Sequence, residues 1–273
     1  MTATTVPVDR EVQEPPRGVI WVLRDSWTEA TRHLRALPRN PDLVGFVVIQ
    51  PIMFVVLFVY VFGGSVSVPG YSNYKQFVVP GIFAQTVLFG STFTGIGIAD
   101  DLTKGFVDRL RSLPMYQSAV LIGRTMSDVV RNLLAFVIML AVAFAIGFRF
   151  EGSLLGGVAA TALLFFFSYA FSWIQALIGL SVKSVEAANS AGFVWMFPLT
   201  FISSAFVSPQ NMPSWLRPIA EHNPFTIVTD ASRALYNGRP AGNDPWIALA
   251  WAVGITVVFA ALSIRKFRSS ASR

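Results

Sequence analysis

The sequence predicts an all-α integral membrane protein with six transmembrane helices. Of its 273 residues, 53% are hydrophobic, 13% are charged and 24 are phenylalanine. This composition excludes an ordinary soluble globular protein, because too few polar side chains remain to cover its surface. Six apolar runs are long enough to cross a hydrocarbon core of about 30 Å, since a helix rises about 1.5 Å per residue. They are residues 43–62, 77–98, 120–148, 154–182, 187–207 and 245–264.

The distribution of basic residues predicts that both termini are cytoplasmic. With the N-terminus inside, 16 of the 21 Lys and Arg residues fall on the cytoplasmic side, which satisfies the positive-inside rule. We therefore expect a multi-pass protein of the plasma (inner) membrane. The net charge of +6 is explained by anionic lipid headgroups, so no nucleic-acid partner is expected. The basic residues left on the outer side are Lys75, Arg149, Arg217, Arg233 and Arg239.

Both ends of the chain differ from the apolar centre. Residues 1–16 are polar, without an apolar run, and predict a disordered cytoplasmic tail with no cleavable signal peptide. Residues 17–37 carry apolar side chains every three or four positions, which predicts a helix lying in the inner interface, with Trp21 and Trp27 at the headgroup level. Residues 265–273 form a basic cytoplasmic tail.

A charged amphipathic segment separates the second and third apolar runs. It reads DDLTKGFVDRLRSLP over residues 100–114, and a helix over 100–113 places Leu102, Phe106, Leu110 and Leu113 on one face. The segment is too short and too charged to cross a bilayer, and the charge distribution puts it in the cytoplasm. We expect it to dock another protein; the alternative is an amphipathic helix bound only to its own lipids.

Arg124, Asp128 and Arg131 open the third apolar run at positions i, i+4 and i+7. This spacing places a carboxylate between two guanidinium groups on one helical face. The three residues form an interfacial charge cluster that either braces the docking helix or is self-compensating, with snorkelling arginines.

Amide and aromatic side chains within the spans are candidates for a substrate path. Gln85 and Gln175 either line a cavity or form hydrogen bonds between helices without any substrate. The aromatic run over 165–173 includes Phe167 and suggests a surface for an apolar substrate. Consecutive aromatic residues point all around a helix, however, so many of them are expected to face lipid.

Residues 208–244 do not read as a simple outer loop. Five prolines interrupt apolar pieces that are each too short to span the membrane. This pattern predicts re-entrant helices at the outer interface that cap a cavity, because irregular backbone at that depth must be satisfied by protein or water.

Several classes of chemistry are absent from the sequence. There is no cysteine, and the only histidines, His33 and His222, fall on opposite sides of the predicted membrane. No glycine is followed by Lys-Ser or Lys-Thr, so the chain has no Walker-type nucleotide site. Neither a Gly-x-Ser-x-Gly nor a His-Glu-x-x-His pattern occurs. We expect no catalytic residue, metal or cofactor in this chain.

Three stretches carry a family resemblance. They read GFVDRLRSLPM at 105–115, SSAFVSPQNMPSWLRPIAEHNPFT at 203–226 and DASRALYNG at 230–238. Together they resemble the permease subunits of ABC-2 type exporters, particularly the daunorubicin resistance permease group. The resemblance implies a six-span permease domain over 17–264 with an N-terminal interfacial helix, a cytoplasmic coupling helix over 100–113 and outer re-entrant helices before the last span.

The resemblance also implies partners. Two permease copies, as a homodimer or heterodimer, would assemble with two separate ATPase subunits that bind ATP and Mg, and the complex would export its substrate. Where many relatives carry a Glu-Gly-Thr-Leu-Glu-like run, this chain has Lys-Gly-Phe-Val-Asp at 104–108, which leaves the identity of the ATPase open. Coupling to the ATPase is expected from Lys104, Phe106, Asp108, Arg109, Leu110, Arg111 and Leu113.

Two other functional classes stay open at this point. A secondary transporter would use Asp128 or Glu186 for ion coupling and would need no ATPase. A membrane anchor for a cytoplasmic partner would need the docking helix but not the outer segment. The sequence does not identify the transported substrate. Drugs, natural products, lipids and glycolipids are all candidates.

Overall fold

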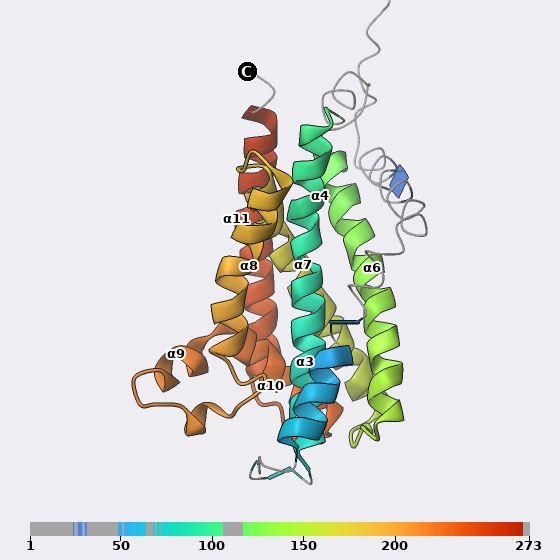
Figure 1. Ribbon diagram of the computed structural model, residues 1–273, viewed down its shortest axis with the longest axis vertical. Coiled ribbons are helices and arrows are strands. Elements are labelled where there is room, and N and C mark those ends of the chain that lie inside the picture. Colours follow the sequence, from blue (N-terminus) through green and yellow to red (C-terminus); the bar gives the residue numbers. More distant parts are fainter. Residues whose placement is uncertain are drawn as a thin grey trace, which may run out of the picture.

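The part of the chain described by the computed structural model folds into a bundle of helices (Figure 1). The described residues are 24, 27, 28, 31, 49–50, 52–63, 68, 70–71, 73–105 and 117–269. In these ranges no residue lies in a strand. The helices are η2 (Leu57–Phe62), α3 (Tyr74–Gly90), α4 (Thr92–Thr103), α6 (Gln117–Ala145), α7 (Leu154–Gly179), α8 (Val185–Phe201), η3 (Pro209–Asn211), α9 (Arg217–His222), α10 (Pro224–Tyr236) and α11 (Asp244–Ser269).

Four helical runs in these ranges are long and apolar enough to cross a membrane: Tyr74–Thr103, Leu121–Ala145, Leu154–Gly179 and Asp244–Ser269. They confirm helices at the second, third, fourth and sixth predicted spans. A shorter apolar helix, Ile52–Val61, lies within the first predicted span. In place of the fifth span, over 187–207, the structure has the 17-residue α8, which ends at Phe201. A count of six spans therefore stays a prediction.

The second span is longer than its apolar run. A turn at Ser91 separates α3 from α4, and the helical run continues past residue 98 to Thr103. Pro80 inside α3 has no N–H, so it leaves the carbonyl oxygen of Gln76 without its helical donor. Asn237 Nδ2 lies 3.2 Å from that oxygen and supplies the missing hydrogen bond. The proline is thus tolerated in the helix because α10 packs beside it.

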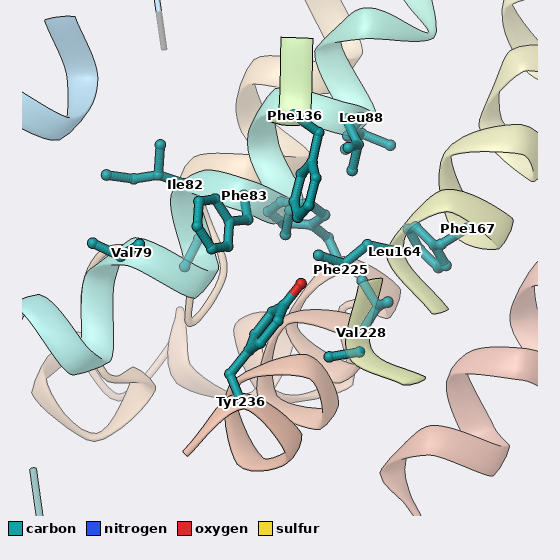
Figure 2. Close-up of a cluster of buried hydrophobic side chains, with 14 of the residues drawn as sticks. Val79, Ile82, Phe83, Leu88, Phe136, Leu164, Phe167, Phe225, Val228 and Tyr236 are labelled. Carbon is teal, nitrogen blue, oxygen red and sulfur yellow. The ribbon is translucent and has the colours of Figure 1, made fainter. Parts of the chain in front are cut away.

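The core lies where α3, α6, α7 and α10 meet, and it is strongly aromatic. Figure 2 shows Phe83 of α3 between Phe136 of α6 and Tyr236 of α10, with ring centroids 5.1 and 5.8 Å away. The hydroxyl group of Tyr236 lies 2.8 Å from Thr161 Oγ1 of α7. Edge-to-face ring contacts of this kind stabilise the packing beyond the burial of apolar surface. The hydrogen bond pairs the one polar atom that Tyr236 brings into the core.

Helix α7 packs against α11 along one side and against α4 on another. Gly95 and Gly179 let the backbones of α4 and α7 approach closely: a Cβ atom at Gly179 would lie 2.3 Å from the carbonyl oxygen of Gly95. Small residues at a crossing allow such an approach between membrane helices. The ends of α4 and α11 lie at the same end of the bundle in Figure 1, and α9 and α10 lie toward the other.

The outer segment over 208–244 contains short helices, as expected, although no observation tests whether they are re-entrant. The side chain of Asn223 forms hydrogen bonds with the backbone of three other residues. Its Oδ1 accepts a hydrogen bond of 2.8 Å from Phe225 N and caps the start of α10, where Pro224 occupies the first position. Its Nδ2 donates to the carbonyl oxygens of Leu199 and Ile202, each at 2.7 Å. One side chain therefore ties the beginning of α10 to the end of α8.

Candidate functional site

The predicted coupling helix begins inside a longer helix. Asp100 and Asp101 belong to the last turn of α4, which ends at Thr103. Lys104 Nζ lies 2.7 Å from Asp100 Oδ2, and this hydrogen bond raises the pKa of the Lys104 ammonium group. Gly105 then turns the chain with a φ of 63°, a conformation that favours glycine. Of the predicted coupling residues, only Lys104 is described; Phe106, Asp108, Arg109, Leu110, Arg111 and Leu113 lie outside the described residues.

The predicted charge cluster forms, and it is buried. Asp128 Oδ1 lies 2.9 Å from Arg131 Nη2, and Asp128 Oδ2 lies 3.6 Å from Arg124 Nε. The Asp128 side chain is only 4% exposed. A buried carboxylate needs both charge pairing and hydrogen bonds, because its desolvation is costly. The cluster supplies both, so it is part of the helix packing and not a set of arginines that only reach toward lipid headgroups.

The cluster also joins α6 to α4, through partners that the sequence spacing alone does not reveal. Thr94 Oγ1 donates a hydrogen bond of 2.5 Å to Asp128 Oδ2. At the end of α4, Asp101 Oδ2 lies 3.7 Å from Arg124 Nη1. The guanidinium group of Arg131 stacks over Phe93, 4.5 Å from the ring centroid. Two carboxylates and two guanidinium groups, together with Phe93 and Thr94 in the first turn of α4, thus hold α4 against residues 124–131 of α6.

Glycine makes room for these long side chains. A Cβ atom at Gly97 would lie 1.6 Å from Arg124 Nη2, and one at Gly90 would lie 2.0 Å from Asn132 Oδ1. Asn132 continues the polar contact toward α7, because its Nδ2 lies 3.4 Å from Ser168 Oγ. Asn132 thus adds a polar contact between α6 and α7 next in sequence to the charge cluster.

The predicted path residues are all buried within this single chain. Gln175 of α7 contacts α8: its Nε2 lies 2.8 Å from Met196 Sδ and 3.4 Å from the carbonyl oxygen of Gly192. Gln85 is 4% exposed. The ring of Phe167 packs against Phe171 at 4.7 Å. Gln175 therefore has the interhelical hydrogen bonds that were the alternative to a cavity, and a role of the three residues in a path stays a prediction.

A second charged cluster, at the end of the bundle that the sequence predicts to face outward, was not predicted as a site. Arg233 of α10 is 2% exposed, although its position in sequence suggested an outer surface. Its Nε donates to the carbonyl oxygen of Phe77 at 2.8 Å, its Nη2 donates to that of Ser204 at 2.7 Å, and its Nη1 pairs with Asp230. Its guanidinium group lies 4.0 Å from the centroid of the Phe77 ring.

The sequence signal for this outer cluster was present within DASRALYNG. Asp230 and Arg233 are an acid-first i,i+3 pair, and Asn237 follows one turn later. The pair looks like an exposed surface pair until the carbonyl groups of α3 and of residues 204–205 are placed around it. The cluster locks α10 across the outer end of α3.

The two clusters are charged links between helices in different parts of the bundle. Among the residues that the structure describes, no group of three or more His, Cys, Asp and Glu side chains could hold a metal. Comparison with known sequences decides the family. The sequence model of the ABC-2 type transporter family matches residues 25–237. The chain belongs to the ABC-2 type transporter family.

Named relatives of this ABC-2 protein are permease subunits. It is 33% identical over 242 residues to the daunorubicin resistance ABC transporter permease protein DrrB1 of Streptomyces coeruleorubidus, covering 89% of this chain and 85% of the relative. It is 26% identical over 213 residues to the probable doxorubicin resistance ABC transporter permease protein DrrC of Mycobacterium tuberculosis, covering 78% and 77%. A 26% identity over 202 residues relates it to the probable multidrug ABC transporter permease YbhR of Escherichia coli, covering 72% and 53%.

These relationships place the chain in a family whose named relatives include drug-resistance permeases, and they confirm the family resemblance of the sequence. The relatives are named as permeases, which agrees with the lack of a Walker-type motif in the sequence. Membership of the family also implies an ABC ATPase partner. Family membership therefore favours an ABC transporter permease over the two alternatives, secondary transport and membrane anchoring.

Proposed function

We propose that this ABC-2 protein is the transmembrane permease subunit of an ATP-driven exporter that moves an apolar or amphiphilic substrate outward. The observation that carries the proposal is the family match over 25–237 together with 33% identity to a daunorubicin resistance permease. The relatives named for resistance to drugs favour a drug or natural product over a glycolipid. The permease lies in the plasma membrane with both termini in the cytoplasm.

The ATPase docks on the segment that follows α4. Phe106, Leu110 and Leu113 fill a groove on the ATPase, and Asp108, Arg109 and Arg111 set the choice of partner. ATP and Mg bind to the ATPase subunit, because the permease sequence has no phosphate-binding loop. Helix α4 supports the proposal, because it ends at Thr103, shortly before this segment, and its contacts with α6 connect the segment to the bundle.

The inner charge cluster passes this movement from α4 to α6. Thr94 and Asp101 on α4 contact Asp128 and Arg124 on α6, so displacement of one helix costs these charged contacts unless the other follows. The permease has an inward-facing and an outward-facing arrangement. ATP closes the ATPase dimer, and the closed dimer shifts the free-energy difference between the two arrangements of the permease. Alternating access in a pair of permease copies then exposes the substrate path to each side in turn.

Transport by reconstituted vesicles tests this proposal. Inside-out vesicles carrying the permease with its ATPase should accumulate a fluorescent amphiphile when ATP is added. Substitution of the Walker lysine in the ATPase should abolish accumulation, while a protonophore should leave it intact. Transport that persists in the Walker variant and disappears with the protonophore would instead establish an ion-coupled transporter. An Arg109→Glu permease should insert normally and lose transport.

A further inference from the structure

Helix α11 turns one side toward the bundle and leaves the opposite side open. Its buried residues are Ala248, Ala252, Ser263 and Phe267, and the Ser263 hydroxyl group donates to the carbonyl oxygen of Trp173 on α7 at 3.2 Å. Only 17% of its apolar 18-residue window is buried, although the helix runs the length of the bundle (Figure 1). An apolar face of this length in a membrane is covered either by lipid or by another protein chain.

The open side of α11 contains an apolar groove with a volume of about 480 Å³. Its lining includes the small residues Ala250 and Gly254, and a Cβ atom at Gly254 would meet nothing within 4 Å. The larger side chains of Trp251 and Val258 are 44% and 52% exposed. The lining extends over residues 247–259, which is about 18 Å of helix. Small residues between large ones thus leave a long hollow on the surface of the bundle.

One edge of the groove is held by the core of the bundle. Ile255 and Phe259 line the groove and also pack against the two hydrophobic clusters of the core. The cluster beside Phe259 contains Trp173 of α7 and Phe267 of α11. The shape of the groove is therefore set by the packing of α11 on α7, and not only by the rotamers of exposed side chains.

The same side of α11 ends in positive charge. Arg265 lies seven residues after Val258 and eleven after Gly254, so the three residues share one side of the helix. Arg268 follows three residues later, and both arginines are exposed. In the described part of the chain neither arginine forms an ion pair with an acidic side chain. The groove therefore leads to two positive charges that this chain does not neutralise.

An apolar groove that leads to two arginines fits a phospholipid with an anionic headgroup. Arg265 lies about 16 Å from Gly254 along the helix axis, and one leaflet of a hydrocarbon core of about 30 Å is about 15 Å thick. An acyl chain in the groove thus reaches Gly254 when its phosphate lies at Arg265. A second copy of this chain fits less well, because two-fold pairing through this side would bring the arginines of both copies together, and like charges repel.

We propose that the groove on α11 binds an anionic phospholipid, whose phosphate group contacts Arg265 and Arg268 and whose acyl chain lies along Val258 and Gly254. The inference goes beyond the proposed transport function, because it concerns a lipid bound to the permease and not the exported substrate. The headgroup lies in the leaflet beside the C-terminal end of α11, which is the cytoplasmic leaflet in the predicted orientation. Two of the basic residues behind that orientation thus gain a defined lipid contact.

Lipid binding to the purified complex tests the site without ATP or substrate. The permease with its ATPase is delipidated in detergent and titrated with phosphatidylglycerol or phosphatidylcholine of the same acyl chains, and native mass spectrometry gives the affinity of the first bound lipid. Phosphatidylglycerol should bind about tenfold more tightly than phosphatidylcholine. Arg265→Gln should weaken phosphatidylglycerol binding about fivefold and leave phosphatidylcholine binding unchanged. Gly254→Leu, which fills the groove, should weaken the binding of both lipids.

Matched controls lie on the same helix. Lys266→Gln removes an exposed charge about 100° around the helix from Arg265, and Val253→Phe adds bulk at a position that is 50% exposed and outside the groove. Neither control should change the affinity for either lipid more than about twofold. The inference is overturned if Arg265→Gln or Gly254→Leu binds phosphatidylglycerol as the unchanged protein does, or if the controls lose as much affinity as the test variants.

A second permease copy is the competing occupant of the groove. The chain has no cysteine, so Ala250→Cys places a single thiol in the groove. Oxidation of membranes with copper phenanthroline should leave this variant as a monomer on a non-reducing gel, because lipid separates the grooves of neighbouring copies. A disulfide-linked permease dimer would assign the groove to a contact between copies and would overturn the lipid site. Either result leaves the Walker-lysine test of ATP-driven export unaffected.

Discussion

Arg233 Nε lies 2.8 Å from the carbonyl oxygen of Phe77, joining α10 to α3 across 156 residues of sequence. The same guanidinium group donates to the carbonyl oxygen of Ser204 and pairs with Asp230. Its planar fork suits this role, because Arg directs several N–H groups at fixed angles while keeping its charge. One buried cation therefore links α10, α3 and residues 204–205 at this end of the bundle, and its substitution should be costly.

Arg233→Met should destabilise the protein strongly. The change leaves the carbonyl groups of Phe77 and Ser204 without their donors, which costs about 1 to 3 kcal/mol for each unsatisfied buried group, and it also removes the partner of Asp230, whose side chain is 38% exposed. Thermal unfolding in detergent, followed by intrinsic tryptophan fluorescence, should show a markedly lower midpoint. The matched control is Arg217→Met, which removes an exposed pair with Glu221 and should cost at most about 1 kcal/mol. Equal midpoints for the two variants would contradict the structural role of Arg233.

Three glycine substitutions should have graded effects. A Cβ atom at Gly81 would lie 2.1 Å from the carbonyl oxygen of Ala205, so Gly81→Ala forces two backbones apart and should reduce the folded yield. Gly97→Ala meets only the flexible end of Arg124 and should leave the fold largely intact while disturbing the pairing with Asp101. Gly254→Ala meets nothing within 4 Å and should be neutral. Expression yield and the midpoint of thermal unfolding should rank the three variants, with Gly81→Ala the most affected and Gly254→Ala the least.

Asp128→Asn should uncouple ATP hydrolysis from transport. The amide keeps the shape and can still accept the Thr94 hydrogen bond, but it removes the carboxylate that pairs with Arg131 and leaves Arg124 with Asp101 as its remaining acidic neighbour. We expect transport per ATP hydrolysed to fall by at least about tenfold, the equivalent of one charged contact of about 1.4 kcal/mol. Unchanged transport with intact assembly would show that the cluster only stabilises the fold.

Asn223→Ala should weaken the junction between α8 and α10. The change removes the cap of α10 and both hydrogen bonds to the end of α8, and loss of an N-cap alone costs about 1 kcal/mol. Hydrogen exchange followed by mass spectrometry should show faster exchange over Leu199–Asn223 than in the unchanged protein. Exchange confined to the region of α4 and α6 would point to a different route of destabilisation.

The sequence predicted the apolar helices well, because length and hydropathy are local properties. Residues 77–98, 120–148, 154–182 and 245–264 correspond to the four long apolar helices. The residues at which the helices end were less predictable. The second helical run continues to Thr103, with Asp101 near Arg124 of α6, and α8 ends at Phe201, where Asn223 donates to the carbonyl groups of Leu199 and Ile202. In both cases the partner residue lies in a distant part of the chain.

In the candidate site, too, local features were predictable from the sequence and contacts between distant segments were not. The spacing of Arg124, Asp128 and Arg131 placed them on one helical face, and they form their cluster as predicted. Their partners on α4 depend on helix packing, which periodicity does not give. Arg233 was counted as an outer positive charge, since no local pattern reveals that carbonyl groups from α3 and from residues 204–205 surround it. The docking residues from Phe106 to Leu113 stay predictions.

Cross-linking from the docking segment tests the central claim most directly, namely that residues 104–113 couple the permease to its ATPase. The chain has no cysteine, so Leu110→Cys introduces a single reactive thiol. With a cysteine-containing ATPase partner and a short bifunctional reagent, this variant should form a permease–ATPase adduct whose yield changes between the nucleotide-free and the trapped ATP-bound complex. Adduct formation from Lys266→Cys in the last turn of α11 but not from Leu110→Cys or Phe106→Cys would contradict it.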